Sequence, residues 1–288
     1  MEFKYAAKNH GLEKIGLNIL EKPAETCDVA RRAGYTGIEI KGQPDRIPPK
    51  LAKEVAAAAA SVGVSIPAVG GAWGGWDAGE ERDLGSSDES VRRQALDYAA
   101  RCVDLAADLG CPVFEICCAP FKQEYPYPSR SLTEVRAYFI EALSEICAYA
   151  ASRGVAIAIE PINRFEGYPG FMNDMEDAMS VVEEMNLDHL GVLVDFFHAN
   201  IEDVSVAGAI KRVGKSLMNI HLSDSNRDLP GTAHIDFVAA VRELEETGYQ
   251  GHMSMGFLPP RPDTGKLRES LLEKAVPYMR EQERAATL

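Results

Sequence analysis

Three side chains able to bind a metal end three apolar segments of the chain. Glu160 ends VAIAIE, Asp195 ends LGVLVD and His221 ends LMNIH. Carboxylate and imidazole groups bind divalent cations, and a buried carboxylate can also act as a general base. An ion pair or a satisfied core histidine would explain any one of them alone. Three such residues ending three successive apolar segments are harder to explain by packing, so together they predict a metal site.

A second group of polar residues follows the same three segments. Side chains of these types bind hydroxylated ligands, although loop caps and surface ion pairs are the alternative for part of the group. Its members are Asn163, Arg164, Glu166, His198, Asp224, Arg227 and His234.

The elements that must position these residues alternate along the chain between short apolar segments and longer ones with helical spacing. This alternation predicts parallel strands joined by crossover helices. Eight such units favour an α/β fold of the closed (β/α)8 barrel type, because no GxGxxG sequence follows the first strand. We expect strands at Ile15–Leu20, Gly37–Lys41, Val64–Gly70, Val113–Cys118, Val155–Glu160, Leu190–Asp195, Leu217–Leu222 and His252–Phe257.

Helices are expected between these strands, several of them beginning at Asp, Ser or Asn and ending at glycine. No linker or low-complexity segment divides the chain, so residues 1–288 are expected to form a single domain, with a terminal loop and helix at 258–288. The active site of such a barrel lies at the carboxyl ends of its strands. The expected helices are Pro49–Val62, Asp88–Leu109, Leu132–Ser152, Asn173–Met185 and Ile235–Thr247.

Composition and charge disfavour several classes of function. The 288 residues include 30 Lys and Arg against 44 Asp and Glu, a net charge of −14 that disfavours a nucleic acid partner. No uncharged apolar stretch long enough to span a membrane occurs, and the N-terminal residues do not resemble a signal peptide, so we expect a cytoplasmic protein. The six cysteines lack paired CxxC motifs and are expected to be reduced. Cys117 and Cys118 could form a redox or metal feature, but packing at a strand end is favoured.

Three longer motifs carry a resemblance to a known family. IEPINRFE, VDFFHANIED and IHLSDSNRDLPGTAHID resemble the sugar isomerase/epimerase barrels, notably the ketose 3-epimerases and hydroxypyruvate isomerases. The resemblance extends along the whole chain, is densest between Glu160 and His234, and also implies a (β/α)8 barrel.

The resemblance implies a role for each candidate residue. Glu160, Asp195 and His221 would bind the metal, with manganese expected first and cobalt or magnesium as alternatives. Glu160 would also abstract the proton next to the carbonyl of a small-molecule sugar substrate, giving an enediolate that the cation stabilises. Contacts to substrate oxygens would come from Glu166, His198 and Arg227. Related barrels often self-associate, so a homo-oligomer is possible.

The chain departs from this pattern at the eighth strand, which in the family ends with a glutamate that is both the fourth metal ligand and the second acid/base. Alignment of the segment HMSMGF places Gly256 at this position. Loss of this carboxylate is expected to weaken metal binding and to impair epimerisation more than a single-base isomerisation. An inactivating substitution and a natural divergence both explain the glycine.

Three other functions remain open. A keto-sugar or cyclitol dehydratase or lyase needs the same enolate, and a silent sugar-binding protein would not need the missing carboxylate. A DNA-repair endonuclease of the same fold would need a basic surface, which the net charge of −14 disfavours. Trp73 and Trp76, in GGAWGGWD, are predicted to form an apolar wall over the substrate, with packing of the glycine-rich loop as the alternative.

Overall fold

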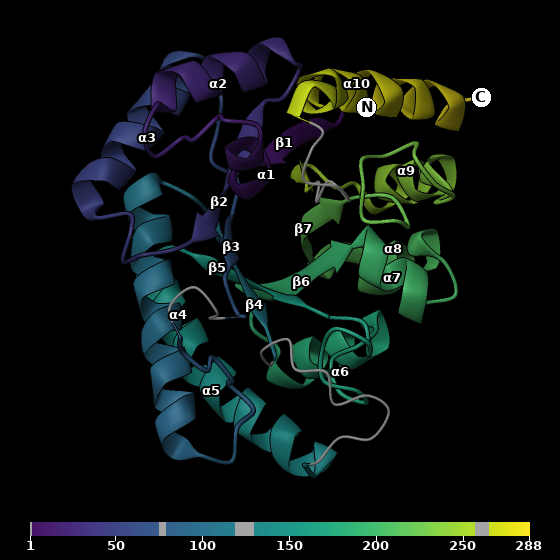
Figure 1. The fold of residues 1–288 in the computed structure, drawn as a ribbon. Helices are drawn as coiled ribbons and strands as arrows, with labels where there is room; N and C mark the ends of the chain where they lie inside the picture. Colours follow the sequence, from purple (N-terminus) through teal and green to yellow (C-terminus); the bar gives the residue numbers. More distant parts are fainter. Residues whose placement is uncertain (1, 75–78, 119–129, 257–264) are drawn as a thin grey trace.

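The eight strands form a closed parallel barrel in the order of the sequence (Figure 1). The computed structural model describes residues 2–74, 79–118, 130–256 and 265–288. Each strand pairs with its sequence neighbours and β8 closes the barrel against β1, as the alternating pattern predicts. The strands are β1 Lys4–Lys8, β2 Gly37–Gly42, β3 Val69–Gly71, β4 Val113–Cys117, β5 Ala156–Glu160, β6 Leu190–Asp195, β7 Leu217–Leu222 and β8 His252–Met255.

The first strand was predicted wrongly. It is Lys4–Lys8, whereas Ile15–Leu20 forms the turn between the first two helices. Gly16 adopts a positive φ of 84°, and the Asn18 side chain accepts a hydrogen bond from the backbone N–H of Leu20. This local side-chain bond competes with strand pairing, and Ile19 is buried because it packs in the core rather than because it is in a sheet.

The third strand is shorter than its apolar segment. Of the expected Val64–Gly70, only Val69 and Gly70 lie in β3, while Ser65 makes an isolated bridge to Gly37. The other predicted strands match to within one or two residues, and Phe257 lies outside the described residues.

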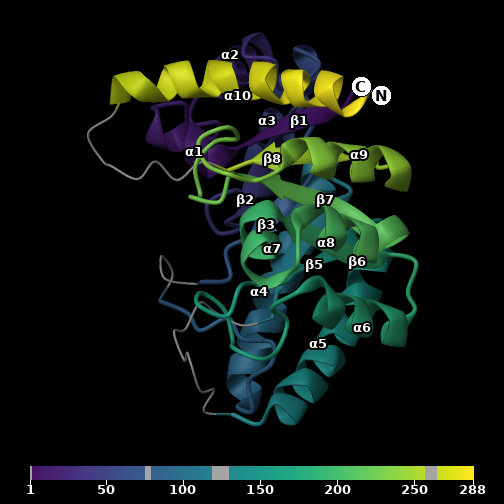
Figure 2. The same cartoon turned by 90° about the vertical axis from the view of Figure 1, so that its right-hand side faces the viewer.

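The helices surround the barrel, and their predicted ends are close to those observed (Figures 1 and 2). The side chains of Asp88, Asp174 and Asp236 accept backbone hydrogen bonds at the N-termini of α4, α6 and α9, and Gly110 and Gly248 end two helices at positive φ. The helices are α1 Asn9–Lys14, α2 Pro23–Arg32, α3 Pro49–Ser61, α4 Glu89–Leu109, α5 Leu132–Ser152, α6 Met175–Met185, α7 Phe196–Glu202, α8 Val206–Val213, α9 Phe237–Thr247 and α10 Gly265–Ala286.

The terminal helix α10 lies on the outside of the barrel, next to α9, as expected (Figure 2). Both views place the two chain ends near one another, on the side where β8 meets β1. Among the described residues, no helix has the length and apolar character needed to cross a lipid bilayer.

Candidate active site

Asp195 is oriented by the helix that begins immediately after it. Its Oδ1 atom accepts hydrogen bonds from the backbone N–H groups of Phe197, at 2.8 Å, and His198, at 3.3 Å, and so caps α7. The capping leaves Oδ2 directed at the mouth of the barrel, 3.6 Å from Nδ1 of His221. The direct passage from β6 into α7 therefore fixes the direction of this carboxylate.

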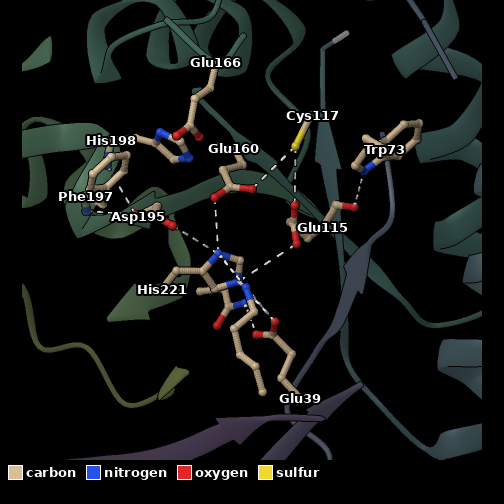
Figure 3. A network of polar contacts seen from close by, with 12 residues as sticks. Glu39, Trp73, Glu115, Cys117, Glu160, Glu166, Asp195, Phe197, His198 and His221 are labelled. Atoms are coloured by element: carbon tan, nitrogen blue, oxygen red, sulfur yellow. Dashed lines mark hydrogen bonds and ion pairs between the residues drawn. The ribbon is translucent and has the colours of Figure 1, made fainter. Parts of the chain in front are cut away.

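Glu160, Asp195 and His221 converge at the carboxyl ends of β5, β6 and β7 (Figure 3). Nδ1 of His221 lies 3.2 Å from Oε1 of Glu160, and all three side chains are almost fully buried. These are the three residues that the sequence predicts as a cluster.

Two further carboxyl groups, which the sequence analysis missed, lie on the other side of His221. Oε1 of Glu39, from β2, is 3.2 Å from Nε2 of His221, and Oε2 of Glu115, from β4, is 3.9 Å from the same nitrogen (Figure 3). Gly70 makes room for both, since a Cβ there would lie 2.9 Å from the Glu39 carboxylate and 3.0 Å from that of Glu115. The available signal was a single glutamate within each apolar segment, GIEIKG and VFEIC.

Lys8, at the end of β1, brings a positive charge into this acidic cluster and was also missed. Its Nζ lies 3.3 Å from Oε1 of Glu39 and 3.1 and 3.0 Å from Nδ1 and Nε2 of His221. Burial alone would lower the pKa of Lys8, but the carboxylates of Glu39, Glu115, Glu160 and Asp195 outweigh burial and raise it above its usual value. The side chain is therefore an ammonium cation.

The carboxyl groups differ in their tendency to ionise. Burial would raise the pKa of Glu160, but His221 beside it outweighs burial and holds the pKa below its usual range. Glu39 is kept ionised in the same way by Lys8 and His221, against the effect of burial. The pKa of Glu115 is raised well above its usual value by burial and then by Glu160, so this acid holds its proton most strongly.

His198, Arg227 and Glu166 form a connected group beside Asp195. An Arg227 nitrogen lies 2.9 Å from Nε2 of His198 and donates to Oε2 of Glu166 at 2.5 Å, and its guanidinium stacks over the Phe197 ring. Burial is the largest cause that lowers the pKa of His198, and Arg227 adds to it against the Asp195 charge. The structure thus brings the predicted substrate-contacting residues together at the edge of the acidic cluster.

The other polar residues of the second predicted group are mainly structural. The Asp224 carboxylate accepts five backbone N–H bonds from residues between 225 and 235 and organises the loop that carries Arg227. Arg164 pairs with Glu202, and His234 contacts Ser225 in an exposed position. Asn163 is closer to the site, since its backbone N–H donates to Nδ1 of His198.

Lys8 also packs against Gly256, at the position where the resemblance predicts a glutamate. A Cβ at residue 256 would lie only 2.8 Å from Cδ of Lys8. Lys8 lines a cavity of about 510 Å³ on the β2 to β4 side, and together with Gly256, Asp195 and His221 it lines one of about 100 Å³. The larger cavity is within the size range of small-molecule sites.

The donor groups and their spacing suit a divalent cation, but Lys8 lies among them. Donor atoms of Glu160, Asp195 and His198 lie within 4.8 Å of one another, as do those of Glu39, Glu115 and His221, and carboxylate with imidazole suits manganese, cobalt or magnesium. However, Lys8 contacts both ring nitrogens of His221. A metal bound to His221 would therefore require the Lys8 side chain to move from its present position.

Trp73 is part of the core. Its indole N–H donates to the backbone carbonyl of Glu115, and its ring packs on Tyr98 and Phe114 with 1% of the residue exposed. Trp73 therefore packs the glycine-rich loop against the core and does not form a wall over the substrate. Trp76 lies outside the described residues, and Cys117 and Cys118 are buried free thiols.

A parallel eight-stranded barrel with a buried carboxylate and imidazole cluster at its carboxyl mouth places the chain among the TIM-barrel proteins. More specifically, a profile of the xylose isomerase-like TIM barrel family matches residues 27–281, so the chain belongs to this family. It is 28% identical over 240 residues to the 3-dehydro-D-guloside 4-epimerase of Escherichia coli, covering 82% of this chain and 86% of the relative.

Two further comparisons agree with this assignment. The chain is 27% identical over 228 residues to an L-ribulose 3-epimerase of a Methylomonas species, covering 77% of this chain and 73% of the relative. The crystal structure of 3-keto-D-glucoside 4-epimerase from E. coli superposes with a TM-score of 0.80 at 24% identity, covering 97% of this chain and all of that one. Both sequence relatives are named as sugar epimerases, and the superposed structure shows the shared fold.

Proposed function

We propose that this protein is a sugar epimerase or isomerase that removes the proton next to the carbonyl of a keto sugar. The observation that carries the proposal is Glu160, a buried ionised carboxylate at the barrel mouth that His221 holds in place. The epimerase relatives support the substrate class.

The chemistry divides between a base and a cationic environment. Glu160 takes the proton from carbon, the C–H electrons form the enediolate double bond, and the carbonyl oxygen becomes negatively charged. The neighbours that keep Glu160 ionised also make it a weaker base, so stabilisation of that oxygen must provide much of the rate. Arg227, His198 and Glu166 bind and orient the hydroxyl groups of the sugar.

Two groups are candidates for the positive charge that stabilises the anionic oxygen of the enediolate. The sequence resemblance predicts a divalent cation, with manganese foremost, held by Glu160, Asp195 and His221, which would polarise the carbonyl. The Lys8 ammonium occupies part of the same space and is the alternative developed in the next subsection.

Gly256 limits the outcome of the reaction. Epimerisation at one carbon needs an acid on the face opposite Glu160, and glycine provides none. Proton exchange and one-face isomerisation are therefore expected to be faster than net epimerisation. Cytoplasmic location and self-association remain predictions from the sequence.

The test is deuterium incorporation from D₂O into a panel of ketohexose, ketopentose and hydroxypyruvate, followed by NMR. Exchange above the buffer rate, lost in Glu160→Gln, supports the proposal. Loss of water with formation of an absorbing enone would instead indicate a dehydratase. Saturable sugar binding with no exchange would indicate a sugar-binding protein.

A further inference from the structure

The geometry points to Lys8 as a built-in replacement for a divalent cation: its ammonium fills the cation position of the acidic cluster and supplies the charge that stabilises an enediolate. The catalytic part of this inference rests on the proposed function. The part that concerns cation binding can be tested independently of any activity.

The first argument is position. Nζ of Lys8 contacts Glu39 at 3.3 Å and both nitrogens of His221 at 3.0 and 3.1 Å, among four buried carboxyl groups from β2, β4, β5 and β6. A lysine can donate three hydrogen bonds and retains its charge in this setting. It thus occupies the place where a metal would have to meet His221.

The second argument is space. Ala7 of β1 is opposite Met255 of β8, so Lys8 and Gly256 are the next residues along two paired strands. A side chain at residue 256 would begin 2.8 Å from Cδ of Lys8. Any side chain at 256 would therefore require Lys8 to move, so the present position of Lys8 depends on the glycine.

The third argument is charge. A divalent cation together with one glutamate adds a net charge of +1 to the cluster, and Lys8 with glycine at 256 adds the same. Within these two pairs the added charge is equal, and the Lys8 ammonium offsets part of the negative charge of the buried carboxylates. Loss of the glutamate alone would instead leave the cluster with a different charge and a weakened metal site.

In the reaction, Lys8 acts as a hydrogen-bond donor. As Glu160 accepts the proton from carbon, the electron pair of the C–H bond moves into the enediolate and the carbonyl oxygen becomes anionic. The ammonium of Lys8 stabilises this oxygen while retaining its own protons. When the proton on Glu160 is replaced by one from solvent, its return to the same carbon completes an exchange. Its return to the neighbouring carbon completes an isomerisation if the hydroxyl proton of the enediolate moves to the former carbonyl oxygen, so no external oxidant or reductant is needed.

The first experiment measures manganese binding by calorimetry and by the EPR signal of free Mn²⁺. The proteins are the unmodified chain, Lys8→Met, the double variant Lys8→Met with Gly256→Glu, and the control Lys4→Met. Lys4 lies on the same strand but at its exposed amino end, so the control removes one charge away from the site. We expect weak binding by the unmodified chain and the control, affinity at least about tenfold higher in Lys8→Met, and a further gain in the double variant.

The second experiment measures deuterium exchange in EDTA. We expect the unmodified chain to exchange without metal, Lys8→Met to lose this exchange, and the double variant to regain it only with Mn²⁺. Because Lys8→Met leaves buried carboxylates without their cation, thermal unfolding is followed with and without Mn²⁺. The metal should raise the Tm of the two Lys8 variants and leave that of the unmodified chain unchanged.

Specific results overturn the inference. Tight Mn²⁺ binding by the unmodified chain would show that the ammonium does not hold the cation position, and this titration needs no variant to fold. Exchange that EDTA abolishes in the unmodified chain, or that survives in Lys8→Met with EDTA, would remove the catalytic role. Absence of exchange by every protein on every sugar would instead refute the proposed function, and the manganese affinities would still decide whether Lys8 replaces the metal.

Discussion

Nδ1 of His221 lies 3.2 Å from Oε1 of Glu160, so an imidazole on β7 holds the carboxylate on β5 across the mouth of the barrel. Glu160→Gln keeps the shape of the side chain and removes the proton acceptor. We expect the exchange rate to fall at least about 100-fold, measured by NMR in D₂O. The matched control is Glu176→Gln, an exposed glutamate paired with Arg212, and exchange that persists in Glu160→Gln would assign the base elsewhere.

Arg227 is predicted to act on sugar binding. Its guanidinium joins Glu166 and His198 and lies over the Phe197 ring. Arg227→Met should raise KM roughly tenfold or more by loss of a charged hydrogen bond, with a smaller effect on kcat. The control is Arg212→Met, which removes a surface arginine paired with Glu176 and Glu183. A fall in kcat at constant KM would contradict a binding role.

Asp224 is predicted to stabilise the loop that carries Arg227. Asp224→Ala leaves five backbone N–H groups without their acceptor. We therefore expect the free energy of unfolding, measured by urea titration, to fall by at least about 2 kcal/mol. KM should rise at the same time, because the position of Arg227 depends on this loop. A stable variant with unchanged KM would show that the loop folds without Asp224.

The contribution of Asp224 should depend on pH. Burial would raise its pKa, but the backbone N–H groups outweigh burial and hold the pKa below its usual value. The carboxylate therefore stabilises the fold above the ordinary aspartate pKa, and this stability is lost as the pH falls through the lowered pKa. The difference in unfolding free energy between the unmodified chain and Asp224→Ala should be full at neutral pH and shrink in strong acid. A pH-independent difference would contradict this origin.

Gly70 is predicted to be required for the buried pair of glutamates. A Cβ in Gly70→Ala would press on the carboxylates of Glu39 and Glu115. We expect a loss of about 1–3 kcal/mol in unfolding free energy and slower exchange, measured by chemical denaturation and NMR. If Gly70→Ala also carries Glu115→Ala, part of the stability should return, because the space is restored. No recovery would indicate that the strain is in the backbone.

Much of the fold can be predicted from the sequence, because the spacing of apolar residues and the capping residues of helices determine structure over short segments of the chain. The helix Leu132–Ser152 is observed with its predicted bounds, and Asp88 and Gly110 delimit α4 as expected. The sequence analysis missed β1 because its apolar segment is only three residues long, between two lysines, while the longer apolar segment Ile15–Leu20 is buried through a turn. Apolar content predicts burial in both cases, and only pairing with β2 and β8 distinguishes the strand.

The candidate site was predictable where a polar residue ends a strand, and not where it lies within one. Glu160 and Asp195 are the last residues of β5 and β6, and His221 is the last but one of β7, whereas Glu39 and Glu115 are flanked by apolar neighbours. A glutamate inside an apolar strand costs too much free energy to be buried alone, which is the signal that could have revealed both residues. The contact of Lys8 with Gly256 could not be predicted, since 248 positions separate them and the first strand had been misplaced.

The pairing of β1 with β8 also has a consequence for synthesis of the protein. The chain emerges from the ribosome in order, so Glu39, Glu115, Glu160 and His221 are all available before β8 is made. Until β8 pairs with β1, Lys8 lacks its contact with residue 256. The surroundings of the Lys8 ammonium are therefore completed only when the last strand of the barrel has been made.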